Sequence, residues 1–266
     1  MGTVGFVPTM GALHDGHISL IKKSNNLCQN TVASIYVNPM QFSPSEDFGT
    51  YPKNIELDLE VLSTLEVEAV FLPTDLIMYP QDFSTFVEEI KLSKVLEGES
   101  RPTFFRGVAT VVVKLFNIVQ PSHVFFGQKD AQQLLVIKKI IKDLAYDVKL
   151  IGCPIIRERN GLAKSSRNQY LTEKNQKHAT RIYKGLEYGK RMLDSGERNA
   201  SIIRKKIIEF LKKGKHINID YVSITYIDTL DEVSMEIIDS ILVSIAVYIE
   251  GIRLIDNFKY CINVID

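Results

Sequence analysis

The residues best suited to chemistry lie between positions 8 and 17, which read Pro-Thr-Met-Gly-Ala-Leu-His-Asp-Gly-His. His14 and His17 are three residues apart, so one helical turn places both imidazoles on the same side. Two imidazoles so placed can donate hydrogen bonds to phosphoryl oxygens and share the charge that grows on an attacked α-phosphate. Gly11 and Gly16 would permit close approach of a ligand to the backbone. The N-terminus of the following helix would offer free N–H groups to a phosphate.

Two other interpretations of this segment stay open. The histidines could do no more than cap the helix. They could also bind a metal, although no third histidine, cysteine or carboxylate accompanies them at zinc spacing.

A second candidate segment is 126–130, Phe-Gly-Gln-Lys-Asp, which follows an apolar run and opens a helical pattern that contains Gln132 and Gln133. Gly127 can admit a ligand to the backbone, and Lys129 supplies a compact cation for phosphate. The alternative is a capped helix start with a solvated Lys-Asp pair.

A third candidate segment is 164–168, Lys-Ser-Ser-Arg-Asn, preceded by Arg157, Glu158 and Arg159. Two hydroxyls and a guanidinium can surround phosphate oxygens, and a loop between domains can close on a substrate. The alternative is a solvated linker.

The segment 38–42, Asn-Pro-Met-Gln-Phe, follows another apolar run, and its amide side chains could orient a small polar substrate. Taken alone it is typical of an ordinary turn. The remaining histidines, His123, His178 and His216, have no convergent partners in the sequence and are interpreted as surface or packing residues.

The helices and strands that must position these segments are predicted to form two domains with a boundary near Pro154, because all nine prolines lie at or before it. Up to that point, apolar strand-like runs alternate with helical patterns, which predicts a Rossmann-like doubly wound parallel sheet of the α/β class. The strands are predicted at 4–7, 32–37, 69–72, 124–126 and 149–152, and the helices at 18–28, 55–64, 108–119 and 132–144. Helices at 173–194 and 200–213, then strands at 221–227 and 241–249, predict a smaller C-terminal α+β domain. The predicted domains are 1–153, which binds the substrates, and 154–266, which closes over the active site.

Composition narrows the function further. The 266 residues carry 32 basic and 32 acidic side chains, so no overall field attracts nucleic acid or an acidic membrane surface. The three cysteines are widely spaced and odd in number, which favours reduced thiols. No secretion signal or long apolar stretch is evident, so we expect a cytoplasmic protein with no membrane or nucleic-acid partner.

Several blocks, in order, make the chain resemble the pantothenate synthetase family, within the His-x-Gly-His nucleotidyltransferase superfamily. The resemblance spans nearly the whole chain and rests on residues 8–17, 37–42, 96–98, 114–117, 127–133, 165–168 and 253–257. It implies that ATP and (R)-pantoate form pantoyl adenylate with release of pyrophosphate, and that β-alanine then displaces AMP to give pantothenate. It also implies a homodimer and Mg²⁺ that arrives with ATP.

The resemblance also implies roles for individual residues. The catalytic residues would be His14, His17, Lys129, Ser165, Ser166 and Arg167. ATP would be contacted by Met10, Gly11, Ala12, Leu13, His14, Asp15, Gly16, His17, Gly127, Gln128, Lys129, Asp130, Ile156, Lys164, Ser165, Ser166 and Arg167. Gln41 and Gln133 would hold pantoate. No metal ligand is assigned, but Asp58 could support the Mg²⁺.

The chain departs from the family pattern at three residues: Phe104 stands where the family has histidine, and Gln128 and Lys164 replace its usual acidic and apolar residues. Family members also usually carry an additional helical segment before the first strand. Two alternatives to the main function are another His-x-Gly-His nucleotidyltransferase and a nucleotide-binding regulatory protein with decayed activity.

Overall fold

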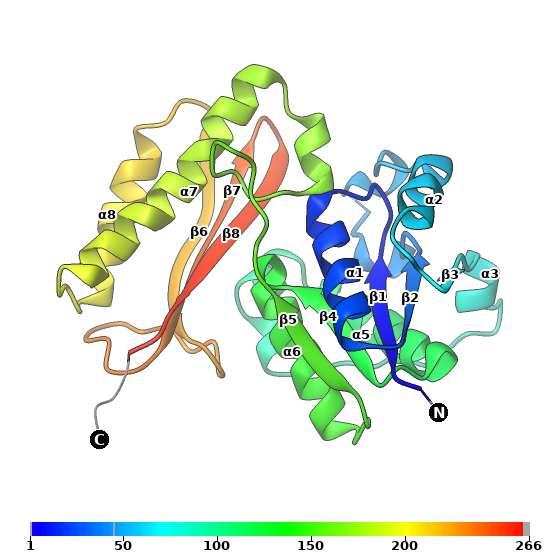
Figure 1. Ribbon diagram of the computed structural model, residues 1–266. Coiled ribbons are helices and arrows are strands. Elements are labelled where there is room, and N and C mark those ends of the chain that lie inside the picture. Colours follow the sequence, from blue (N-terminus) through cyan, green and yellow to red (C-terminus); the bar gives the residue numbers. More distant parts are fainter. Residues whose placement is uncertain (1, 45, 263–266) are drawn as a thin grey trace. The chain divides into compact units, whose positions relative to one another are not determined.

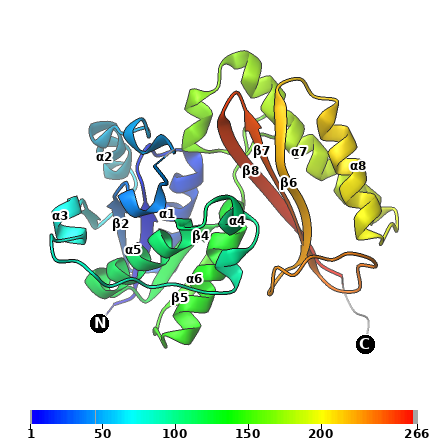
Figure 2. The same cartoon turned by 180° about the vertical axis from the view of Figure 1, so that it is seen from behind.

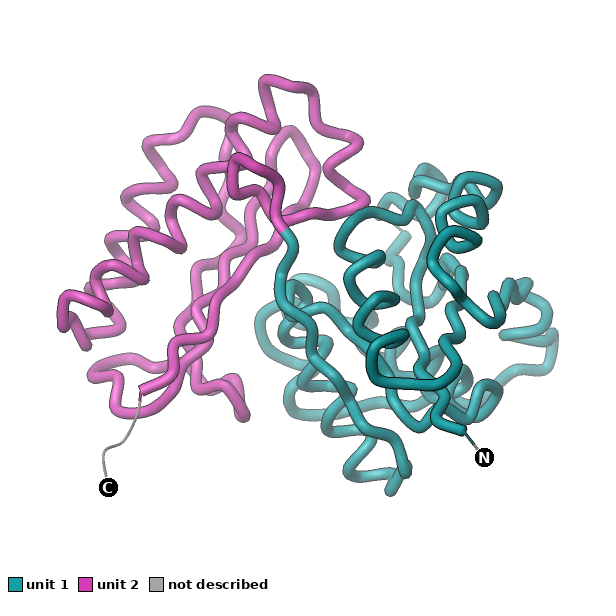
Figure 3. The backbone as a smooth tube through the Cα atoms, in the orientation of Figure 1, with its two compact units in different colours: residues 1–156 teal, residues 157–266 magenta. Residues whose placement is uncertain are grey.

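The computed structural model describes residues 2–44 and 46–262. The chain forms two compact units, residues 1–156 and 157–266 (Figure 3). The boundary predicted from the last proline, between residues 153 and 154, lies beside this division.

The first unit is built on a five-stranded parallel sheet in the order β3-β2-β1-β4-β5, as predicted for a doubly wound fold (Figure 1). Its strands are β1 (Val4–Thr9), β2 (Asn30–Ile35), β3 (Ala69–Phe71), β4 (His123–Gly127) and β5 (Lys149–Cys153). Its helices are α1 (Asp15–Leu27), α2 (Ile55–Ser63), α3 (Asp75–Met78), α4 (Glu97–Ser100), α5 (Phe104–Val119) and α6 (Ala131–Asp143). Short 3₁₀ helices include η1 (Pro39–Gln41), η3 (Leu92–Lys94) and η4 (Gln128–Asp130).

Apolar residues on the central strands face both sides of this sheet. Phe6 belongs to a core cluster with residues of α5 and α6, whereas its neighbour Val7 belongs to a second cluster with Leu20 and Ile21 of α1. Successive side chains of a strand point to opposite faces, so a strand covered on both sides must be apolar throughout. Figure 1 shows α1 against one face, and Figure 2 shows α5 from the other side.

Strand β1 occupies the centre of the sheet, between β2 and β4. All the strands are parallel, so the loops that follow β1, β2 and β4 leave the sheet at one edge. These loops contain three of the candidate segments, and ligands of open α/β sheets bind at this edge.

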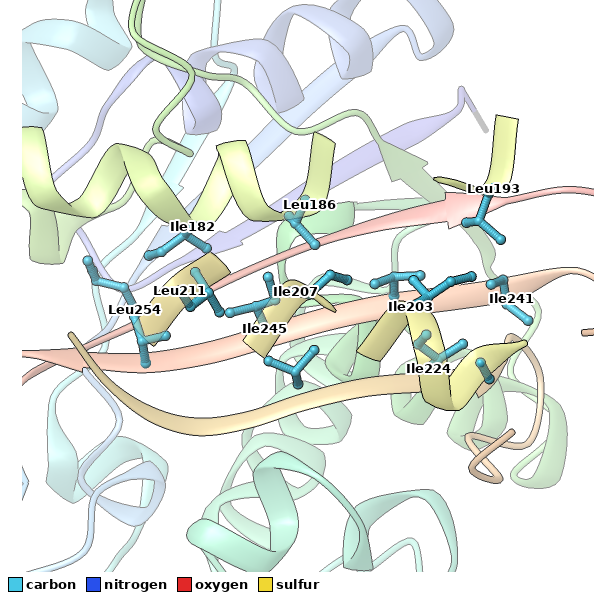
Figure 4. Close-up of a cluster of buried hydrophobic side chains, with 14 of the residues drawn as sticks. Ile182, Leu186, Leu193, Ile203, Ile207, Leu211, Ile224, Ile241, Ile245 and Leu254 are labelled. Carbon is cyan, nitrogen blue, oxygen red and sulfur yellow. The ribbon is translucent and has the colours of Figure 1, made fainter. Parts of the chain in front are cut away.

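The second unit is a small α+β fold, as predicted, in which helices α7 (Glu173–Asp194) and α8 (Ala200–Lys212) pack on an antiparallel sheet. The sheet has the order β6-β7-β8, with β6 (Ile217–Tyr226), β7 (Ile241–Ile249) and β8 (Ile252–Tyr260). Its core joins Ile182 of α7, Ile207 of α8 and Ile245 of β7 (Figure 4). Strand β8 was not among the predicted elements.

Among the described residues, no helix is long and apolar enough to cross a membrane. Cys28, Cys153 and Cys261 are free thiols, in agreement with the prediction from their spacing.

Candidate active site

The loop after β1 ends in two histidines that cap α1 with one ring nitrogen each. His14 is the N-cap residue, and its Nδ1 accepts a hydrogen bond from the Gly16 amide at 3.1 Å. The Nδ1 of His17 accepts from the His14 amide at 3.3 Å. The two ring centroids are 4.1 Å apart. The capping interpretation is therefore correct for the Nδ1 atoms.

This pattern assigns the hydrogens of the two rings. An Nδ1 that accepts a hydrogen bond carries no proton, so each ring carries its N–H on Nε2. Burial lowers the pKa of His17 to about 3, with further lowering by His14 and by the charge of Lys129. His17 is consequently a neutral imidazole near pH 7, with its ring N–H on Nε2. Lys129 follows β4, so the loops after β1 and β4 converge at these rings.

The two glycines of the loop leave room for contacts within the protein. A Cβ on Gly16 would lie 2.7 Å from Cε1 of His14, so glycine is needed for the ring to fold back onto the Gly16 amide. Gly11 has a φ of +80°, and a Cβ there would lie 2.8 Å from Oδ2 of Asp58.

Side chains also accept hydrogen bonds from other backbone N–H groups of the loop. The Gly11 amide donates to Oγ1 of Thr9 at 3.2 Å. The Ala12 and Leu13 amides donate to Oδ2 and Oδ1 of Asp58 at 2.9 and 2.7 Å. Asp58, considered from the sequence as a support for Mg²⁺, is 2% exposed and binds these two loop amides.

The segment after β4 begins with open space at Gly127, where an added Cβ would meet no atom within 4 Å. Lys129, whose side chain is 19% exposed, lies 3.7 Å from the Asp130 carboxylate. The Lys-Asp pair of the alternative interpretation is therefore present, and Lys129 also lies close enough to His17 to lower its pKa.

Gln132 has a role that the sequence did not indicate. Its Nε2 donates to the carbonyls of Leu92 and Val95, both at 2.7 Å, and its Oε1 accepts from the Glu97 amide at 3.1 Å. These bonds hold a segment in which Leu96 adopts a φ of 50° and a ψ of −112°, a conformation unfavourable for a residue with a Cβ. Gln133 lies beside Gln132 in the first turn of α6 and is half-buried.

The segment after β2 is organised around Asn38, which is 1% exposed. Its Nδ2 donates to Oε1 of Gln41 at 2.9 Å and to the Gly107 carbonyl at 3.1 Å. Its Oδ1 accepts from the Tyr79 hydroxyl at 2.7 Å. Because Oε1 of Gln41 accepts from Asn38, the amide of Gln41 is oriented with Nε2 as its remaining donor.

Arg101, which directly follows α4, supports the same segment. Its guanidinium donates to the Gln41 carbonyl at 3.0 Å and lies 2.5 Å from a carboxylate oxygen of Glu46. The guanidinium carbon is also 3.7 Å from the centre of the Phe104 ring. Phe104, a departure from the family pattern, therefore provides a cation–π platform for the residue that holds Gln41.

The candidate segment of the second unit follows a tight turn that Arg157 anchors. The guanidinium of Arg157 forms two bonds with the Asp256 carboxylate, at 2.5 and 3.0 Å, and lies 4.4 Å from the centre of the Tyr183 ring. Beyond the turn, Lys164 pairs with Glu158 at 3.2 Å, and Oγ of Ser165 accepts from the Arg167 amide at 3.3 Å. Ser166 is 5% exposed. The segment is thus an ordered 3₁₀ turn, η5 (Ser166–Tyr170), and not an irregular linker.

The other histidines belong to other elements. His123 shares a hydrogen bond of 3.0 Å with Oγ of Ser122, and the rings of His178 and His216 have centroids 5.5 Å apart in the second unit. No group of three or more His, Cys, Asp or Glu within residues 2–44 and 46–262 could hold a metal ion.

Two imidazoles that cap a helix at the carboxyl edge of a parallel sheet place the molecule among α/β proteins of the His-x-Gly-His type. The sequence model of the pantoate-beta-alanine ligase family matches residues 1–259. The chain belongs to the pantoate-beta-alanine ligase family.

Individual relatives agree over most of the chain. It is 48% identical to the pantothenate synthetase of Thermosipho africanus over 258 residues, which are 96% of this chain and 91% of the relative. The crystal structure of pantothenate synthetase from Thermus thermophilus matches with a TM-score of 0.93 and 39% identity, covering 96% of this chain and 92% of that one. A pantoate-beta-alanine ligase from Francisella tularensis, complexed with Beta-gamma ATP and Beta-alanine, matches with a TM-score of 0.78 and 35% identity, covering 97% and 89%.

Proposed function

We propose that the chain condenses (R)-pantoate with β-alanine at the expense of ATP, through a pantoyl adenylate, and releases AMP and pyrophosphate. The observation that carries this proposal is the pair of imidazoles of His14 and His17, with Lys129 close to His17, in a chain of this family. The Francisella tularensis relative was crystallised with Beta-gamma ATP and Beta-alanine, which supports both as substrates here.

In the first half-reaction, the pantoate carboxylate attacks the α-phosphorus of ATP, and the bond to the bridging oxygen breaks with its electron pair on pyrophosphate. The carboxylate is already ionised, so it needs positioning more than a general base. His14, His17 and Lys129 stabilise the charge on the α-phosphate as it becomes five-coordinate. Donors fixed in advance are effective because they do not reorganise during the reaction.

Pantoate lies, in this proposal, against the amides of Gln41 and Gln133. The hydrogen bond from Asn38 to Oε1 of Gln41 directs Nε2 as a donor, which suits a carboxylate or hydroxyl oxygen. In the second half-reaction the β-alanine amine attacks the acyl carbon, AMP leaves with the electron pair of the acyl–oxygen bond, and the amine loses a proton.

ATP occupies, in this proposal, the segments named from the family resemblance. Residues 10–17 and 127–130 border the phosphates and Ile156 borders the adenine. Lys164, Ser165, Ser166 and Arg167 neutralise the leaving pyrophosphate and shield the adenylate from water. The loop after β1 acts through its side chains, because Thr9, Asp58 and the histidines engage its amides.

We propose that Mg²⁺ enters bound to ATP. Mg²⁺ keeps several waters and is usually held by substrate phosphates with one or two carboxylates. When bound, it would neutralise phosphate charge.

We further propose a cytoplasmic homodimer, on the strength of the family resemblance and the composition. Sedimentation equilibrium of the purified chain measures the assembly, and a molecular mass of one chain at micromolar concentration would refute the dimer.

The function is tested by following AMP and pyrophosphate with ATP and Mg²⁺, while pantoate or β-alanine is omitted in turn. We expect pantoate alone to give one enzyme equivalent of pyrophosphate and a bound pantoyl adenylate, and β-alanine to convert it to pantothenate. ADP and phosphate as products would refute adenylation. Transfer of a nucleotide without any requirement for an amine would favour another nucleotidyltransferase, and ATP binding without turnover would favour a regulatory protein.

A further inference from the structure

We propose that Asp58 is a positioning residue for the reaction, which holds the loop after β1 in the shape that His14 and His17 require. The inference rests on the proposed function for its catalytic consequence. Its structural part concerns only the contact between one carboxylate and the loop backbone.

The contact is a two-point clamp. Oδ2 and Oδ1 of Asp58 accept hydrogen bonds from the consecutive amides of Ala12 and Leu13, at 2.9 and 2.7 Å. A single carboxylate can accept both bonds because it presents two oxygens without a donor. Leu13 directly precedes the N-cap His14, so the clamp fixes the chain at the entry to α1.

The backbone conformation of the clamped loop is locally unfavourable. Gly11 and Ala12 have φ values of +80° and +49°, and Ala12 carries a Cβ that disfavours this region. Strained backbone persists where the surroundings determine it more strongly than local preference does. Asp58 supplies that determination, and the absence of a side chain on Gly11 makes room for the carboxylate.

The charge of Asp58 is supported by backbone groups. No Lys, Arg or His in residues 2–44 and 46–262 forms an ion pair with it. It lies in the first turn of α2, whose N-cap Asn54 accepts from the Leu57 amide at 3.0 Å. The positive end of the helix dipole favours a carboxylate in this turn. Both oxygens face the loop through hydrogen bonds, so we assign Asp58 to the loop and not to the metal.

The test compares Asp58→Asn with Glu56→Gln, which removes one negative charge from the same turn at an exposed position. We expect Asp58→Asn to lower pantoate-dependent pyrophosphate release by roughly 10- to 100-fold, since small displacements of catalytic groups have effects of this size. The KM for pantoate should change little, and Glu56→Gln should behave as the wild type. Asn offers one acceptor oxygen and a donor in place of the second, so one of the two amides loses its partner.

A measurement without substrates separates this inference from the proposed function. In ¹H–¹⁵N spectra of the free protein, Asp58→Asn should shift the amide resonances of Ala12 and Leu13 and speed the hydrogen exchange of at least one of them. A double-mutant cycle with Gly11→Ala should be non-additive, because either change disrupts the same contact. If the wild type makes no pantothenate while these resonances still shift, the clamp stands and the proposed function fails. Unmoved resonances, or lost activity restored by raising Mg²⁺, would overturn the inference in favour of a metal role.

Discussion

Gly16→Ala should separate catalysis from stability, because it displaces the His14 ring without straining the fold. The Cβ of alanine would lie 2.7 Å from Cε1 and 2.8 Å from Nδ1 of that ring. The ring must swing away, and the bond from the Gly16 amide to Nδ1 is lost. The backbone of Gly16 does not have a positive φ, so alanine fits the helix itself.

Gly16→Ala should have two opposing effects on the free energy of unfolding but only lower the reaction rate. Loss of a helix cap costs about 1 kcal/mol, and alanine in place of glycine in a helix gains about 0.5–1 kcal/mol. The net change should stay within about 1 kcal/mol, or a Tm shift of roughly 2–4 °C. Removal of one donor to transition-state charge lowers the rate by roughly 10²- to 10³-fold.

The assay is pyrophosphate release from ATP and pantoate, read beside thermal unfolding of the same preparation. The control is Gly196→Ser, at a position where an added Cβ meets no atom within 4 Å. Its φ of +96° predicts some loss of stability with retained activity. Wild-type pyrophosphate release by Gly16→Ala would refute the assignment of His14, and a loss of activity that merely follows unfolding would refute the separation of the two effects.

The remaining predictions concern pantoate, acid and the second unit. Gln41→Leu should weaken use of pantoate by about 1–3 kcal/mol in kcat/KM, with a smaller effect on ATP, in kinetics that vary each substrate; equal losses would indicate collapse of the site. Phe104→Leu should raise the KM for pantoate by a few-fold, since cation–π contacts contribute about 0.5–2 kcal/mol. An unchanged KM would show that the contact between Arg101 and Phe104 does not affect the position of Gln41. The pKa of His17 is lowered to about 3 from 6.5, so the unfolded chain binds one more proton between these values. Stability should therefore fall by about 1.4 kcal/mol per pH unit as the pH decreases from 6.5 to 3, and His17→Gln in urea titrations should remove that part of the slope. Asp256→Asn should destabilise the second unit by about 3 kcal/mol, because it leaves Arg157 without its carboxylate; an unchanged urea midpoint would contradict this.

The central strands β1 and β4 could be predicted because helices cover both of their faces, which leaves apolar runs in the sequence. Strand β8 could not, since it contains Asp256 and Asn257, which are 3% and 5% exposed. The local sequence pattern predicts that polar residues of this kind lie at the surface. The partner of Asp256 is Arg157, 99 residues away in sequence, so only the tertiary structure explains the burial.

In the candidate site, too, the sequence predicts residue types but not the contacts of individual atoms. The histidine pair, Lys129 and the amide of Gln41 could be proposed as site residues from residue type and from their place after strands. Residue type alone does not distinguish Asp58 from Glu56, two acids in one helical turn, although one is buried and the other exposed. Nor does it indicate which nitrogen of each imidazole caps the helix, because that depends on backbone geometry.

The central position of β1 in the sheet affects the order in which the first unit can fold during synthesis. Its neighbour β2 follows within a few tens of residues, but β4 begins at His123, and the Val4 amide bonds to Ser122, 118 residues further along the chain. Pairing over such a separation is slow because loop closure must precede it. A chain emerging from the ribosome as far as α5 would therefore expose one edge of β1, and unpaired edges recruit other strands. During synthesis, the strand that leads into the histidine loop should be the part of the first unit most dependent on chaperones.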